Sequence, residues 1–118
     1  MRSLTTGSYA AAQPEQPKTV LIESAADYAR IWAETIGGGE RPPADFEKES
    51  VVILLAGLKR SGGYSVEARG VTLEGRVLVV DAVVKSPPPD AIVTMALTSP
   101  FAVIAVNTKA LDSVRWDP

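Results

Sequence analysis

Residues 50–58, Ser-Val-Val-Ile-Leu-Leu-Ala-Gly-Leu, constrain the fold of this chain more than any other stretch. The run contains no charged residue, and Val51, Val52 and Ile53 are β-branched. An apolar run of this length without polar alternation predicts a strand that is covered on both faces. It is too short to span a membrane. The chain is therefore predicted to be organised around this buried strand.

A glycine turn and a second strand are predicted to follow the buried strand. Ser61-Gly62-Gly63 is a strong turn signal. Residues 64–69 then alternate between apolar and polar, as a half-exposed strand does. The sequence thus predicts a buried strand, a glycine turn and a partner strand at the centre of the protein.

Composition limits the class of protein. A chain of 118 residues with 46% hydrophobic and 22% charged residues suits one domain with one core. The net charge of −2 gives no electrostatic case for nucleic acid or an anionic membrane as partner. No apolar stretch approaches the length of a membrane span. Residues 1–13 lack the pattern of a signal peptide. As written, the protein is expected in the cytoplasm; if a signal peptide has been removed, it is exported.

Cysteine and histidine are both absent from the sequence. Their absence excludes disulfides, thiolate zinc sites, Ser-His or Cys-His catalysis and histidine acid–base chemistry. The acids Asp45, Glu47 and Glu49 alternate along one stretch, but ligands for a cation must converge, so no metal site is predicted. No cofactor is expected. The lack of cysteine and the scarcity of Asn and Gln are typical of a thermophile.

The chain divides into an arm and one domain. Residues 1–18 are small and polar, and they are predicted to be either a flexible arm or an edge strand, with residues 6–10 as the candidate strand. Residues 19–118 are predicted to form the domain, which begins with a short strand over residues 19–23.

A helix is predicted over residues 24–36. Ser24 and Asp27 have the spacing of a capping box, with Asp in place of the usual Glu, and Gly37 suits the position after the C-cap. One face of the helix is apolar and is expected to be buried. This face comprises Tyr28, Ile31, Trp32, Thr35 and Ile36.

Further strands are predicted after the glycine turn. The apolar phase slips by one residue at Gly70, which predicts a β-bulge there. Glu74-Gly75 predicts a tight hairpin link. Residues 76–86 are apolar on both faces, which favours a strand inside the sheet.

Two breaks, at residues 87–90 and at residues 98–100, divide the last part of the chain. The prolines of residues 87–90 stop strand pairing, because proline offers no ladder donor. Residues 91–97 are predicted to be a further strand or an irregular segment at the sheet edge, and residues 101–106 a strand. In the polar tail, Leu111, Val114 and Trp116 are expected to pack back onto the sheet. The predicted fold class is therefore α+β, with one helix packed on a mainly antiparallel, strongly curved sheet or open barrel of about six strands.

Residues 44–106 resemble the C-terminal domain family of PrcB, a subunit of a protease complex. The order of short motifs carries the resemblance, and the helix before Pro42-Pro43 is similar to the stretch that family members carry ahead of this domain. One departure is Arg60-Ser61, where the family often has Pro-Thr. The motifs are Asp45-Phe46, the strand 51–57, Ser61-Gly-Gly-Tyr-Ser-Val66, the hairpin to Val84, Pro87–Pro89, Val93 and Leu97-Thr-Ser-Pro-Phe101.

The resemblance implies a non-catalytic accessory module that supports or stabilises a secreted protease. The partner implied is a protein, with a protease as the candidate. A protein-binding surface is predicted where two loops, residues 59–64 and 87–90, form one continuous rim at the same end of the sheet, because loops on a rigid sheet are common sites of recognition. The candidate residues are Arg60, Ser61, Gly62, Gly63, Tyr64, Pro87, Pro88, Pro89 and Asp90.

Other interpretations of these residues remain open. The glycine loop could be a plain hairpin turn, and the prolines could simply end an edge strand. The chain could be a peptidase inhibitor that presents residues 59–64 and 98–101, although a strand over residues 91–97 would place residues 98–100 at the opposite end. It could also be a structural domain that forms a homodimer through a sheet edge. Neither Lys85 with Ser86 nor Lys59 with Ser61 has the surroundings of a catalytic pair, so no enzyme is predicted.

Overall fold

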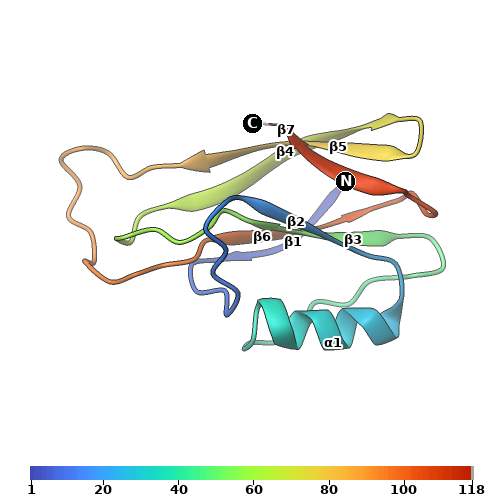
Figure 1. Cartoon of the computed structure of the whole chain (residues 1–118), viewed down its shortest axis with the longest axis horizontal. Helices are drawn as coiled ribbons and strands as arrows, with labels where there is room; N and C mark the ends of the chain where they lie inside the picture. Colours follow the sequence, from blue (N-terminus) through green and yellow to red (C-terminus); the bar gives the residue numbers. More distant parts are fainter. Residues whose placement is uncertain (118) are drawn as a thin grey trace.

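A computed structural model gives the structure of residues 1–117 as two sheets packed face to face, with one helix covering the other face of the larger sheet (Figure 1). The strand order is β1-β6-β3-β2 in the larger sheet and β4-β5-β7 in the smaller one. None of the helices in the described part of the chain has the length and apolar character to cross a membrane. The elements are β1 (Arg2–Gly7), β2 (Lys18–Ile22), α1 (Ala25–Thr35), β3 (Ser50–Leu55), β4 (Ser65–Glu74), β5 (Val77–Lys85), β6 (Phe101–Val106) and β7 (Ser113–Asp117).

The predicted α+β class with one helix and mainly antiparallel pairing is confirmed. The prediction of one strongly curved sheet or open barrel of about six strands is wrong in its detail, because the described residues form seven strands in two separate sheets. One pair, β5 with β7, is parallel. A single sheet with a helix on one face would leave the other face of β3 uncovered, and the second sheet covers it.

Strand β3 is buried along its whole length because its two faces belong to two different cores. Val52 and Leu54 pack between the sheets, while Val51, Ile53 and Leu55 pack under the helix. Strand β6 lies beside β3 and divides its side chains in the same way. This arrangement explains why the apolar run in the sequence shows no alternation.

The prediction that residues 64–69 form the ladder partner of β3 is wrong. Strand β3 pairs with β2 on one edge and with β6 on the other, so no edge is left for β4. Strand β4 lies in the smaller sheet and pairs with β5. Residues 56–64 therefore form a crossing between the two sheets rather than a hairpin turn.

The capping residues of α1 are those that the sequence predicts. Ser24 is the N-cap, and its hydroxyl oxygen accepts a hydrogen bond of 3.2 Å from the Asp27 amide. Gly37 follows the C-cap with a φ of +93°, a backbone conformation that glycine adopts readily. Its amide donates to the Trp32 carbonyl at 2.9 Å. These contacts satisfy backbone groups that the helix ends would otherwise leave unpaired.

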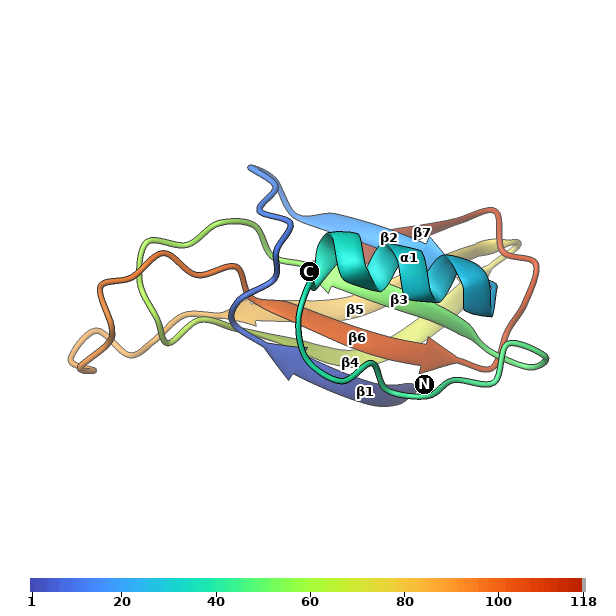
Figure 2. The ribbon, with the colours of Figure 1, turned by 90° about the horizontal axis from the view of Figure 1, so that it is seen from below.

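The helix lies along the outer face of the larger sheet and buries Tyr28, Trp32 and Ile36 (Figure 2). The Tyr28 ring stands edge-on to Trp32, with 6.0 Å between the ring centroids, and edge-on to Phe46 at 5.4 Å. The Tyr28 hydroxyl donates to the Pro42 carbonyl at 2.7 Å. Burial raises the pKa of this hydroxyl, because the charged form is disfavoured away from water. The aromatic cluster thereby fastens the loop after the helix to the helix itself.

We expect Trp32→Ala to lower the free energy of unfolding by about 3–5 kcal/mol, because it removes a large aromatic side chain that is 95% buried (5% exposed). Denaturant unfolding measures the change. Glu34→Ala, on the exposed side of the same helix, is the matched control and should shift stability by less than about 0.5 kcal/mol. An equal effect of both changes would contradict the packing described above.

Two glycines in the smaller sheet have the predicted roles. The register of β4 and β5 shifts between Ala68 and Gly70, which confirms the bulge. Gly75 adopts a φ of +63° in the turn between the same strands, which confirms the tight hairpin.

The C-terminal tail packs onto the smaller sheet, as predicted. Leu111 is buried, and Val114 and Trp116 pack against the core between the sheets. The structure adds that this segment is itself a strand, β7. The turn into it places Ala110 at a φ of +58°, and the Ala110 amide donates to the Glu23 carboxylate at 2.7 Å. A contact between residues so far apart in sequence could not be predicted from the pattern of the tail alone.

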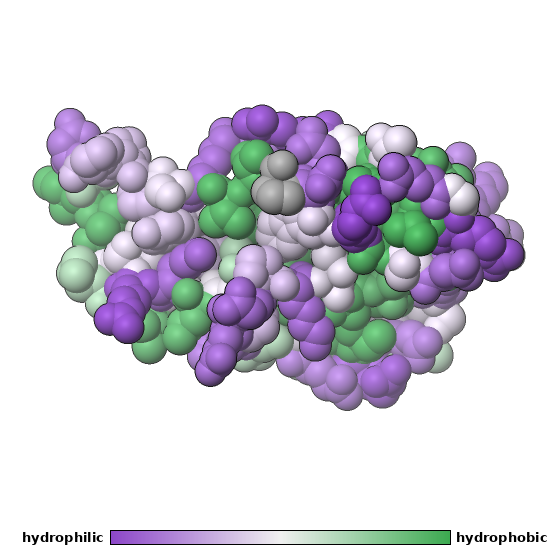
Figure 3. Space-filling model, turned by 45° about the horizontal axis from the view of Figure 1, so that its top comes forward, coloured by the Kyte–Doolittle hydropathy of each residue, from purple (hydrophilic) through white to green (hydrophobic). Residues whose placement is uncertain are grey.

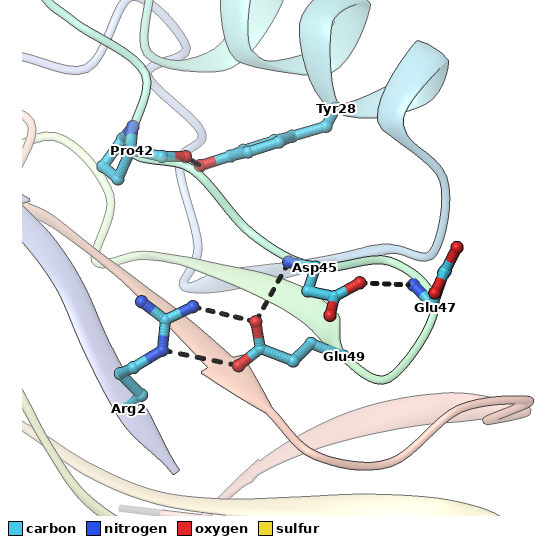
Figure 4. Close-up of polar contacts among 6 residues, drawn as sticks. All are labelled: Arg2, Tyr28, Pro42, Asp45, Glu47 and Glu49. Carbon is cyan, nitrogen blue, oxygen red and sulfur yellow. Dashed lines mark hydrogen bonds and ion pairs between the residues drawn. The ribbon is translucent and has the colours of Figure 1, made fainter.

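The N-terminal segment forms β1, an edge strand beside β6. An ion pair of 2.8 Å between the Arg2 guanidinium and the Glu49 carboxylate joins β1 to the stretch before β3 (Figure 4). Glu49 also accepts the Asp45 amide at 3.1 Å. The hydrogen bond from Arg2, and after it the Asp45 amide, lower the pKa of Glu49 from its ordinary value of 4.5.

This lowered pKa predicts a loss of stability in acid. The unfolded chain binds the Glu49 proton more tightly than the folded protein does, so the ion pair contributes fully above the ordinary pKa of the carboxyl. The contribution is lost as the pH falls through the lower, folded pKa. Between about pH 6 and pH 3, stability should fall less steeply in Glu49→Gln than in the wild type. Urea unfolding at each pH measures it, and the neighbouring change Glu47→Gln should keep the wild-type slope.

Candidate functional site

Three stretches of chain meet at the end of the sandwich where the chain leaves β3 and β5. They are residues 58–64, residues 86–98 and, beside them, residues 8–9, and we call this region the loop end. Figures 1 and 2 show the first two stretches projecting together beyond the sheets. The loop end contains every residue of the predicted protein-binding surface.

Main-chain hydrogen bonds hold the two long loops together. The Lys59 amide donates to the Thr98 carbonyl at 2.8 Å, and the Thr98 amide donates back to Lys59 at 2.9 Å. The Gly62 amide donates to the Thr94 carbonyl at 2.7 Å. The Thr98 hydroxyl adds a bond of 2.8 Å to the Ser61 carbonyl. Residues 91–98 are thus anchored along the glycine loop, although they form no regular strand.

Gly63 is the point where the glycine loop and the proline loop touch. A Cβ atom placed on Gly63 would lie 2.7 Å from the Pro87 Cβ and 2.9 Å from a methyl carbon of Val93. The φ of Gly63 is +88°, which a residue with a side chain rarely adopts. The structure therefore brings residues 59–64 and 87–90 side by side, and this contact depends on the missing side chain of Gly63.

Residues 98–100 do not lie at the opposite end of the sheet, where a strand over residues 91–97 would place them. Residues 91–97 do not cross the sheet as a strand, because they lie against the glycine loop and the ladder of β6 begins only at Phe101. Thr98 consequently pairs with Lys59 at the loop end. However, Thr98, Ser99, Pro100 and Phe101 are all buried, so this stretch supports the loop end from within and does not form its surface.

The predicted site residues differ in exposure. Arg60, Pro88, Pro89 and Asp90 are exposed. Ser61, Gly62, Tyr64 and Pro87 are half-buried, and Gly63 is exposed. The Lys59 Nζ lies over the Tyr64 ring, 5.6 Å from the ring centroid, in a cation–π contact. Tyr64 is therefore only in part available as a recognition anchor.

The most exposed apolar side chains of the loop end belong to residues that the sequence interpretation did not single out. Ile92 is fully exposed, Met95 is 83% exposed and Leu97 is 58% exposed. Leu58 and Tyr9 add exposed apolar surface beside them. Figure 3 shows hydrophobic residues at the surface of this end among hydrophilic ones. The apolar pattern of residues 91–97 carries this signal, but the same pattern also predicts a strand or an irregular segment at the sheet edge.

Gly63→Ala tests whether the close contact with Pro87 shapes the loop end. We expect it to lower the free energy of unfolding by about 1–3 kcal/mol, because alanine is strained at a positive φ and its methyl group would collide with Pro87. Gly38→Ala is the matched control, since a Cβ atom there meets nothing within 4 Å and the φ of Gly38 is not positive. Thermal or denaturant unfolding of both variants gives the comparison, and equal stabilities would rule out the packing role of Gly63.

In a comparison with known protein families, residues 50–107 match the family described as PrcB C-terminal. The match confirms the family resemblance that the sequence motifs suggest. It covers the chain from β3 to the end of β6 and includes both loops of the loop end. No curated protein and no solved structure shows a significant similarity to the chain.

Proposed function

Because residues 50–107 belong to the PrcB C-terminal family, we propose that this chain is a non-catalytic protein-binding module, an accessory domain that supports or regulates a protease. The loop end is the proposed binding surface. The observation that carries the proposal is the exposure of Ile92, Met95 and Leu97 on one anchored loop.

Exposed apolar side chains that cluster on a surface are typical of protein interfaces. Methionine and aromatic residues are enriched there, and Met95 and Tyr9 belong to this group. Three rigid prolines precede the apolar stretch, and main-chain bonds from Gly62 and Lys59 fix it farther along. A loop that is already ordered loses less conformational entropy on binding, so its apolar side chains can act as anchors.

The lysines near the loop end support a non-catalytic role. A lysine general base needs a neutral amine in a desolvated site. The Lys85 ammonium instead forms an ion pair with Glu67, and this contact lowers the pKa of the Glu67 carboxyl. Lys59 lies over the Tyr64 ring. Lys85 is exposed and Lys59 is half-buried, so neither lies in a desolvated site.

A peptidase inhibitor is a weaker candidate. It would have to present residues 98–101 to the peptidase, and these residues are buried. A homodimer through a sheet edge is also disfavoured on one side of the molecule. Both edge strands there, β1 and β4, have register shifts, and such bulges protect an edge against pairing with another chain.

The double variant Ile92→Ser, Met95→Ser tests the proposed surface. The wild-type chain is used as bait to isolate a protease from cells that express this chain. The dissociation constant is then measured with the purified protease. We expect the double variant to weaken binding about 30-fold or more, since truncating an interface anchor typically costs at least about 2 kcal/mol.

Leu73→Ser is the matched control for this experiment. Leu73 is 48% exposed but lies in the hairpin of β4 and β5, outside the loop end. Binding by this variant should equal that of the wild type. An unchanged affinity of the double variant, or a sedimentation result in which the protein is a dimer that binds no protease, would disprove the proposal.

A further inference from the structure

Met95 combines high exposure with a side chain that is easily oxidised. The sequence contains no cysteine and two methionines, Met1 and Met95, so these two thioethers hold its only sulfur atoms. Met95 is 83% exposed, whereas Met1 is 49% exposed. Two-electron oxidants convert a methionine thioether to a sulfoxide. Met95 is therefore the more exposed of the two side chains that such an oxidant attacks.

The position of Met95 gives this chemistry a consequence for the surface. Met95 lies between Ile92 and Leu97 on one loop, and all three side chains are exposed. The thioether is apolar, whereas the sulfoxide is polar and carries an oxygen that accepts hydrogen bonds. Oxidation therefore places a polar group in the middle of the apolar stretch 92–97. Covering such a group without a hydrogen-bond donor costs free energy, so the oxidised surface is a poorer apolar contact.

The fold does not depend on the Met95 side chain. Met95 belongs to neither of the two cores. Main-chain bonds hold the loop on both sides of it: the Gly62 amide donates to the Thr94 carbonyl at 2.7 Å, and the Thr98 amide donates to the Lys59 carbonyl at 2.9 Å. A sulfoxide at position 95 stays in water and leaves these bonds in place. Oxidation should thus change the surface without unfolding the protein.

We propose that Met95 is a site of reversible oxidation by hydroperoxides, and that oxidation removes the apolar character of the loop end while the fold is kept. The sulfur attacks one oxygen of the peroxide, so that an S–O bond forms as the O–O bond breaks. The proton on the new S–O–H group passes to the leaving hydroxide, which gives the sulfoxide and water. The sulfur loses the two electrons that the peroxide gains.

The modification is reversible because methionine sulfoxide is a substrate of sulfoxide reductases. Two thiols supply the electrons and become a disulfide, and the sulfoxide oxygen leaves as water. The exposed loop gives a reductase access to position 95. The effect of this cycle on a protein partner rests on the function proposed for the loop end, whereas the oxidation itself does not.

Peptide mapping by mass spectrometry after timed treatment with hydrogen peroxide tests the site. The rate of oxygen uptake at Met95 in the folded protein should lie within about twofold of the rate in the urea-unfolded chain, because the side chain is already in water. A rate that folding lowers by about tenfold or more would show a protected sulfur and overturn the proposal.

Hydrophobic-interaction chromatography and denaturant unfolding test the consequence without a partner. The oxidised protein should elute earlier than the untreated protein, and its denaturant midpoint should be unchanged. A sulfoxide reductase with dithiothreitol should restore the original elution. Unchanged elution after complete oxidation of Met95 would overturn the proposal, and so would a lower denaturant midpoint, which would mean that the side chain supports the fold.

Met95→Leu is the matched control and is compared with itself before and after peroxide. This variant keeps an apolar side chain at position 95 and keeps Met1, but it has no sulfur in the loop end. Peroxide should leave its elution unchanged. A shift as large as that of the wild type would assign the change to Met1 and count against Met95.

Affinity for the protease isolated with the wild-type chain gives the readout that rests on the proposed function. Complete oxidation of Met95 should weaken binding about tenfold or more, because the sulfoxide would be buried in the interface, and the reductase should restore it. Equal binding by both forms would overturn regulation through Met95 and leave the proposed function standing. A chain that binds no protease even before treatment would disprove the proposed function alone, since the oxidation rate, elution and unfolding decide the Met95 site.

Discussion

Burial of the central sheet on both faces is the constraint on which the rest of the structure depends. The side chains of β3 and β6 belong alternately to the core under the helix and to the core between the sheets. Each core needs its own cover, since apolar surface left in water is unfavourable. The helix and the smaller sheet are these two covers. Loss of either would expose one whole face of β3.

The connections between the layers create the surfaces available for function. The chain must leave the larger sheet after β3 to reach β4, and it must return after β5 to reach β6. Both crossings run at the same end of the molecule, where Gly63 and Pro87 touch and the Lys59 and Thr98 backbones pair. The apolar side chains of Ile92 and Met95 stay exposed, because they lie on the second crossing, before the ladder of β6 begins at Phe101.

The edge strands of the sandwich differ in the regularity of their pairing. Edge strands β1 and β4 are bulged, whereas β2 pairs with β3 in unbroken register. Bulges therefore protect the edge formed by β1 and β4, whereas no bulge interrupts the pairing of β2.

The sequence by itself determined the features that depend on neighbouring residues. Ser24 and Gly37 set the ends of the helix, Gly70 sets the bulge, and the apolar run at β3 signals burial on both faces, because each acts through local backbone geometry or periodicity. The predicted glycine and proline loops also share one end of the molecule.

Only the tertiary structure decided which strands pair and which apolar residues stay in water. An apolar, β-branched stretch such as residues 91–97 has the same pattern whether it enters a sheet or lies on a loop, so its exposure depended on a ladder that begins only at Phe101. The separation of β4 from β3, and the pairing of β7 with β5, likewise depend on contacts between distant segments. Local propensity carries no information about such contacts.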